Sequence, residues 1–207
     1  MKANKSLSSV VLLLFCLMLS AQTSDVIYQK MNSAYKGISS FQAELKQDNY
    51  FPQIKKSISY SGSIHFTRGR MVIRFDKPNV QRLMINEGVV DLYDAQSKTV
   101  LRSRMRPEFN KMNPVEILQL FWKKSEVTVL STKGNFWEVS LKPLNDPNIT
   151  SLSATINRKT ALVQTLSYED TNGNKVTYNF SGIKLNAQIP ESIWIYKYPK
   201  DVQVVQQ

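Results

Sequence analysis

The chain has 207 residues, 42% hydrophobic side chains and a formal net charge of +11. This length suits one domain with its own hydrophobic core and leaves little room for a second. The basic residues are scattered and lack the interleaved aromatic side chains that stack on bases, so no nucleic-acid partner is expected. If the chain is exported, its positive charge suits anionic lipid headgroups or an acidic protein surface.

The first 21 residues have the pattern of a secretory signal peptide. Lys2 and Lys5 precede an apolar run over residues 10–19, which is followed by the small pair Ser20 and Ala21. The run is about half as long as the roughly 20 residues of a membrane-spanning helix. We therefore expect cleavage near Ala21 and one mature domain over residues 22–207. Cys16 lies in the discarded part, so the mature chain would have no thiol for a disulfide, a metal site or catalysis.

The remaining sequence is dominated by a period of two. One amphipathic helix is predicted over residues 24–38 from the helical spacing of its apolar side chains. Alternation then predicts about eleven strands joined by short turns, which favours an antiparallel meander that curls into a barrel or half-barrel. Twelve segments show such alternation: 41–45, 58–66, 71–75, 81–85, 89–93, 99–105, 127–131, 136–141, 151–157, 163–168, 175–185 and 192–196.

A second helix is predicted over residues 113–124. Asn113 can cap it, and Pro114 suits the first helical position. Its residues 115–122 leave almost no polar face, so this short helix must be covered on both sides or must itself cover something apolar.

Residues with catalytic or ligating chemistry are sparse. His65 is the only histidine, and it lies on a predicted strand without a second histidine at metal spacing. The acidic pairs Glu169/Asp170 and Asp91/Asp94 fall at a turn and a strand end, as acidic residues often do. Neither a serine-nucleophile motif nor a phosphate-binding glycine loop occurs. The sequence therefore predicts no enzyme, no metal and no cofactor.

Five motifs carry a resemblance to a known family. They are ISSFQAELKQ at residues 38–47, GSIHFTR at 62–68, MVIRFDKP at 71–78, INEG at 85–88 before an apolar strand ending in Tyr, and QIPESIWIYKYPKDVQVV at 188–205. In order and spacing they resemble the periplasmic outer-membrane lipoprotein carrier family, LolA. The resemblance covers nearly all of the chain after the predicted signal peptide.

The resemblance implies a mainly β, half-open antiparallel barrel of about eleven strands, with covering helices and an internal apolar cavity for lipoprotein acyl chains. The expected cavity and lid residues are Met71, Ile73, Phe75, Leu83, Ile85, Leu92, Ile117, Leu118, Phe121 and Trp122. The same alternation is typical of a filled core, and the sequence does not distinguish a cavity wall from one. Val72 lies on the opposite face of the strand at 71–75, where we expect substitution by glutamate to be mild.

One polar residue is expected to matter by the same resemblance. Members of the family have an arginine at the end of the second long strand that is thought to hydrogen-bond the lid backbone and lock the empty cavity. Counting from Gly62 places it at Arg68, whereas counting back from Pro78 gives Thr67. Gly69 stands where the family usually has proline. The alternative is that Arg68 is simply solvated.

The implied function is that of a periplasmic, monomeric carrier. Its cargo would be triacylated lipoproteins, received from an inner-membrane lipoprotein-releasing transporter and delivered to an outer-membrane acceptor. The alternative is another periplasmic lipid-binding protein, or a sensor of envelope stress with the same half-barrel. Such sensors carry a second domain, for which we expect no room here.

Overall fold

The computed structural model describes residues 23–104 and 114–207. The predicted signal peptide, with Cys16, and the predicted cap Asn113 lie outside the described residues. Within the described ranges, no helix is both long enough and apolar enough to cross a bilayer.

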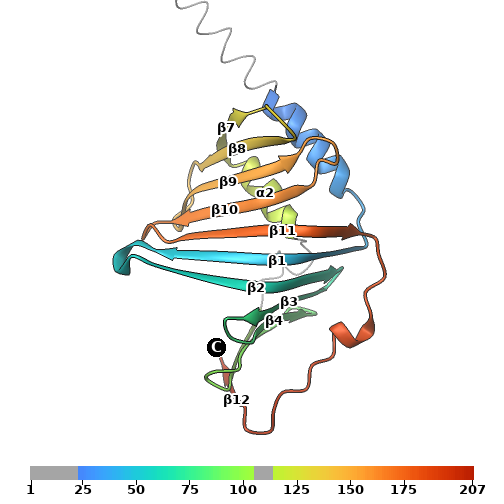
Figure 1. The fold of residues 1–207 in the computed structure, drawn as a ribbon, viewed down its shortest axis with the longest axis vertical. Coiled ribbons are helices and arrows are strands. Elements are labelled where there is room, and N and C mark those ends of the chain that lie inside the picture. Colours follow the sequence, from blue (N-terminus) through green and yellow to red (C-terminus); the bar gives the residue numbers. More distant parts are fainter. Residues whose placement is uncertain (1–22, 105–113) are drawn as a thin grey trace, which may run out of the picture.

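Twelve strands form one sheet (Figure 1). They are β1 (Ser40–Phe51), β2 (Lys56–Thr67), β3 (Arg70–Lys77), β4 (Gln81–Asn86), β5 (Val89–Asp94), β6 (Thr99–Arg104), β7 (Ser125–Ser131), β8 (Phe136–Pro143), β9 (Ile149–Asn157), β10 (Val163–Asp170), β11 (Lys175–Leu185) and β12 (Gln203–Gln206). Their order is β12-β6-β5-β4-β3-β2-β1-β11-β10-β9-β8-β7, and every neighbouring pair is antiparallel except β12 with β6. The outer strands β12 and β7 do not pair, so the sheet is open. The prediction of a mainly β, antiparallel fold with covering helices is confirmed, with twelve strands in place of about eleven.

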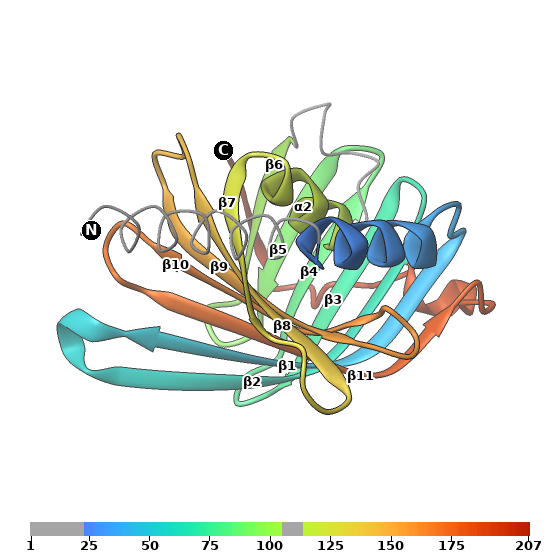
Figure 2. The same ribbon diagram turned by 90° about the horizontal axis from the view of Figure 1, so that it is seen from above.

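Two helices lie on the concave side of this sheet (Figure 2). The N-terminal helix spans residues 23–35 and buries Ile27 and Met31. The hydroxyl of its last residue, Tyr35, accepts a hydrogen bond of 3.0 Å from the backbone N–H of Val163, and burial raises the pKa of Tyr35 to about 12. The helix ends before Gly37, whose φ of +71° is left-handed, so it is shorter than the predicted 24–38.

Rows of apolar side chains cross the concave face from strand to strand. Ala43, Ile64, Ile73, Leu83 and Leu92 are successive register partners on β1 to β5. Because side chains alternate between faces, the neighbouring row faces outward.

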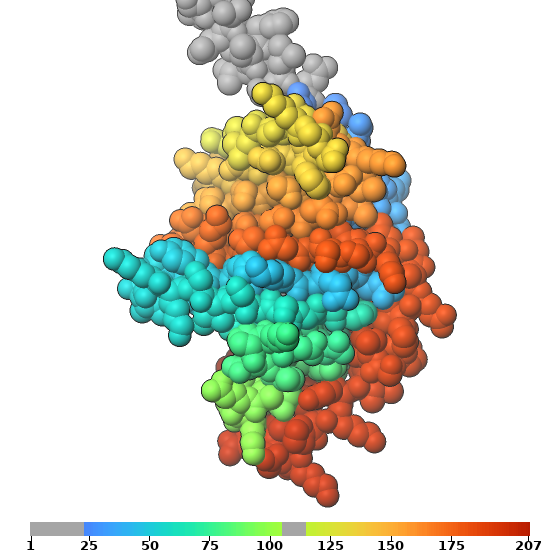
Figure 3. All heavy atoms as spheres, viewed as in Figure 1, coloured from blue at the N-terminus to red at the C-terminus, as the bar shows by residue number. Residues whose placement is uncertain are grey.

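The C-terminal segment covers the outward face of β3 to β6. The predicted strand at 192–196 is wrong, because the short 3-10 helix η3 (Glu191–Ile193) leads instead into an irregular stretch that ends in β12. In that stretch Trp194 lies over the guanidinium of Arg70, and Tyr196 lies over that of Arg82 at 4.1 Å. In Figure 3 the C-terminal segment, in red, lies beside the green strands.

The packing of the C-terminal segment on this face corrects an expectation about β3. Val72 faces the C-terminal segment's side of the sheet and is only 2% exposed, so Val72→Glu would bury a charge and is not the mild substitution expected. Nearby, Asp91 accepts hydrogen bonds from Nε and Nη2 of Arg102 at 2.6 and 2.7 Å and from the hydroxyl of Tyr198 at 3.1 Å. These hydrogen bonds hold the pKa of Asp91 below its ordinary value, although its burial acts in the opposite direction.

Asp91→Asn is expected to lower the free energy of unfolding by about 2 kcal/mol at pH 7, because it removes charged hydrogen bonds from a largely buried site. A carboxyl whose pKa is lowered by folding stabilises above its unfolded pKa and loses that contribution as the pH falls through the folded pKa. The difference between variant and wild type should therefore shrink below about pH 4. Urea unfolding at several pH values measures it, and a difference that is independent of pH would contradict the argument.

Candidate functional site

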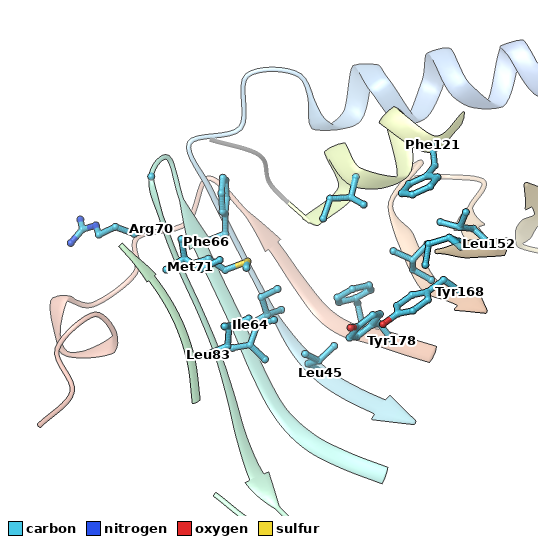
Figure 4. A pocket seen from close by; sticks show the side chains of 17 residues that line it. Leu45, Ile64, Phe66, Arg70, Met71, Leu83, Phe121, Leu152, Tyr168 and Tyr178 are labelled. Atoms are coloured by element: carbon cyan, nitrogen blue, oxygen red, sulfur yellow. The ribbon is translucent and has the colours of Figure 1, made fainter. Parts of the chain in front are cut away.

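A cavity of about 430 Å³ lies between the concave face of the sheet and helix α2 (Pro114–Trp122). Strands β1 to β4 and β9 to β11 supply its walls. In Figure 4, Phe66 and Met71 lie on one side of the space, Leu152 and Tyr168 on the other, and Phe121 lies above it. The lining is apolar apart from two tyrosines, one arginine and the turn glycine Gly69.

Six of the ten residues expected at the cavity line it. They are Met71, Ile73, Leu83, Ile85, Ile117 and Phe121. Three others, Phe75, Leu118 and Trp122, are buried in the core rather than at the cavity surface. Leu92 belongs to the same cross-strand row as Ile73 but is 42% exposed and lies outside the lining. That these side chains bind a ligand stays a prediction.

The unusual composition of α2 follows from its position. One stripe, formed by Val115, Leu118 and Trp122, is buried, and the Trp122 ring lies 5.8 Å from that of Tyr28 in the N-terminal helix. A second stripe, formed by Ile117 and Phe121, faces the cavity. The two stripes lie roughly a third of a turn apart at the 3.6-residue period of a helix. The helix is apolar nearly all round because it packs on the core and covers the cavity at once.

Most of the cavity wall was not anticipated from the sequence. Leu45, Ile64 and Phe66 come from β1 and β2, Gly69 and Arg70 from the β2–β3 turn and the start of β3, and the others come from the C-terminal half of the sheet. Those others are Ile149, Leu152, Leu166, Tyr168, Tyr178 and Phe180. Their alternation predicts a buried face, and what it lacks is any sign that the face borders a space rather than a neighbouring side chain.

The arginines near the β2–β3 turn do not enter the cavity. Arg70 contributes its stem to the wall, but its guanidinium points away (Figure 4), where it pairs with Glu191 at 3.4 Å and contacts the Trp194 ring. Arg68 is exposed in the turn, and Thr67 has a buried hydroxyl without a hydrogen-bond partner among the described residues. A lid-locking role for Arg68 stays a prediction, since residues 105–113 lie outside the described residues.

The other residues considered for catalysis or metal binding lie outside the cavity. His65 is a register partner of Val72 and so faces away from the cavity, and burial together with the charge of Arg74 lowers its pKa. In the described ranges, no three His, Cys, Asp or Glu side chains come together as a metal site would require. The lining suits an apolar ligand, and among the described residues that form it no nucleophile is paired with a base.

The chain matches a known protein family. The family model for the outer membrane lipoprotein carrier protein LolA matches residues 36–197. The chain belongs to the LolA family. The matched part begins directly after the N-terminal helix and ends beyond η3, and thus contains every strand that lines the cavity. No curated protein sequence matches the chain.

Solved structures share the LolA-type fold at low identity. An uncharacterized conserved protein from Thermus thermophilus has a TM-score of 0.56 at 13% identity, with 89% of this chain and 99% of that chain covered. MucB, in the MucA/MucB complex of Pseudomonas aeruginosa, has a TM-score of 0.50 at 12% identity, with 84% of this chain and 61% of that chain covered. These similarities establish the fold alone.

Proposed function

We propose that this protein is a periplasmic carrier that shields the acyl chains of lipoproteins in its cavity and moves them from the inner to the outer membrane. The observation that supports the proposal is an apolar cavity in a chain that belongs to the LolA family. A buried methylene group contributes about 0.8 kcal/mol, so a triacylated lipoprotein needs such shielding to cross an aqueous compartment. The N-terminal pattern of a signal peptide supports export.

A carrier of this kind does not need to break bonds. An apolar wall resembles a membrane interior, so uptake and delivery are nearly balanced steps, and partners give them direction. The partners we propose are an inner-membrane transporter that releases lipoproteins and an outer-membrane acceptor. Without Lys2 and Lys5 of the predicted signal peptide, 25 basic and 16 acidic residues remain, and this net charge of +9 suits anionic partners of either type. We propose no enzymatic activity and no cofactor.

The second candidate is a lipid-binding sensor. Its support is the structural similarity to MucB, which was solved in complex with the protein MucA. In that case the cavity would bind a lipid as a signal, and the lipid would alter the binding of a protein partner instead of being delivered.

Photo-crosslinking from within the cavity tests the proposal. We expect p-benzoylphenylalanine at Phe121, which lines the cavity, to form adducts with acylated lipoproteins when cells are irradiated. The same residue at Phe136, which is 40% exposed on β8 and outside the cavity, is the matched control and should form none. Mass spectrometry of the adducts identifies the cargo.

The adducts also separate the two candidates. Adducts with free lipid or phospholipid alone would favour the sensor. An absence of any adduct specific to Phe121 would show that the cavity binds neither ligand, and would contradict both candidates.

A further inference from the structure

Two tyrosines give the apolar cavity one polar position. Tyr168 on β10 and Tyr178 on β11 both line it, and their ring centroids lie 6.4 Å apart. Figure 4 shows their hydroxyls directed toward one another at the end of the cavity beside Leu45, away from Phe121 of the covering helix. The other side chain in the lining that bears a polar group, Arg70, directs its guanidinium away from the cavity.

Both tyrosines are part-buried, so a ligand that covered their hydroxyls without bonding them would remove them from water at a cost. Tyr178 stacks on Phe180, which fills its part of the wall without a hydroxyl, so packing alone does not require tyrosine here. A hydroxyl without a partner in an apolar environment costs about 1–3 kcal/mol. Two hydroxyls that bond each other satisfy one donor and leave the second O–H to find another acceptor.

Both tyrosines keep the hydroxyl proton that a hydrogen-bond donor needs. Burial raises the pKa of both Tyr168 and Tyr178, so both are neutral at pH 7. One further polar side chain lies beside them: Gln47 on β1 is the register partner of Tyr178, and it lies outside the cavity lining. The amide of Gln47 is committed to Asn49 through a hydrogen bond of 2.8 Å from its Nε2. Oε1 of Gln47 is left open by this bond, but no hydrogen bond joins it to either tyrosine hydroxyl among the described residues. The hydroxyl pair therefore offers a donor to a ligand in a largely apolar cavity.

We propose that Tyr168 and Tyr178 bind the carbonyl oxygen of an ester or amide that links an acyl chain to its cargo, with the chain lying toward Phe121. This inference rests on the proposed function and deepens it. It makes the site selective for acyl esters and amides over plain hydrocarbon, and it fixes the direction of the chain: carbonyl at the tyrosines, methyl end under α2.

Displacement of the fluorescent apolar probe 1-N-phenylnaphthylamine tests this selectivity. The competitors are methyl decanoate and tridecane, which have the same number of heavy atoms but differ in the carbonyl group. We expect Tyr168→Phe combined with Tyr178→Phe to reduce the affinity ratio of ester to alkane about fivefold, the factor of one hydrogen bond. Because ester hydration is common to all variants, the change in the ratio reports on the protein alone.

Tyr93→Phe is the matched control, since Tyr93 is a buried tyrosine on the opposite face of the sheet and should leave the ratio at the wild-type value. An unchanged ratio in the double variant would overturn the carbonyl site while the cavity remained an acyl-binding site. If neither ligand displaced the probe from the wild type, the proposed function would fail and this inference with it.

Discussion

Gly62→Ala is expected to lower the free energy of unfolding by about 3 kcal/mol or more, through overpacking against a neighbouring backbone. A Cβ at Gly62 would lie 1.7 Å from the carbonyl oxygen of Arg74 and 2.8 Å from Cα of Phe75. The β2–β3 register shifts between Ser61 and Gly62, which is a bulge at this close approach. Since the obstructing atoms are backbone, the two strands must separate, and both of them line the cavity.

Urea unfolding of Gly62→Ala measures this effect, and Ser61→Ala is its control. Ser61 is the exposed neighbour on the same strand, so its substitution should change the stability by less than about 0.5 kcal/mol. If the two variants had equal stability, the close approach of β3 to Gly62 would not exist in solution.

Ile73→Glu is expected to abolish uptake of an acyl ligand and to destabilise the fold by several kcal/mol at pH 7. Ile73 lines the cavity between its register partners Ile64 and Leu83, so a carboxylate there would have no cation beside it within the lining. Burial raises the pKa of such a group in the folded state. Its protonated form is then compatible with folding below the unfolded pKa, and stability is lost as the pH rises through the folded pKa.

The pH dependence makes this prediction specific to charge. Unfolding of Ile73→Glu by urea should show the variant recovering stability toward pH 4, near the ordinary pKa of glutamate of about 4.3. The uncharged variant Ile73→Gln should lack that trend. Leu92→Glu is the positional control, because Leu92 shares the cross-strand row but is largely exposed. Normal uptake by Ile73→Glu would mean that this face does not border the binding site.

Alternation of apolar and polar residues was sufficient to locate β1 to β11. A side-chain period of two arises when one face of a strand packs on the core and the other face meets a polar environment. It failed at residues 192–196. There Trp194 and Tyr196 alternate with exposed Ile195, yet the alternation arises from aromatic side chains packed on arginines across the outer face. A segment that lies flat on a sheet face has the same period as a strand within it, but no ladder of hydrogen bonds.

The same limit of local patterns explains why only part of the cavity lining was predicted. The apolar residues of β3 and β4 were expected there because of the family resemblance, whereas Tyr168 and Tyr178 carried no comparable signal. Leu118 and Trp122 were expected at the cavity because α2 is apolar all round, but the helical period alone does not say which stripe meets the core. Whether a buried face is filled depends on the volumes of side chains far apart in sequence, which no local pattern encodes.

Native mass spectrometry of the protein purified from the periplasm of the cells that produce it tests the central claim most directly. The account predicts a population with the added mass of an acylated lipoprotein, and its loss in Ile73→Glu but not in Leu92→Glu. Protein that carries no ligand, or carries the same free fatty acid or phospholipid in wild type and Ile73→Glu alike, would contradict the claim that this cavity transports lipoproteins.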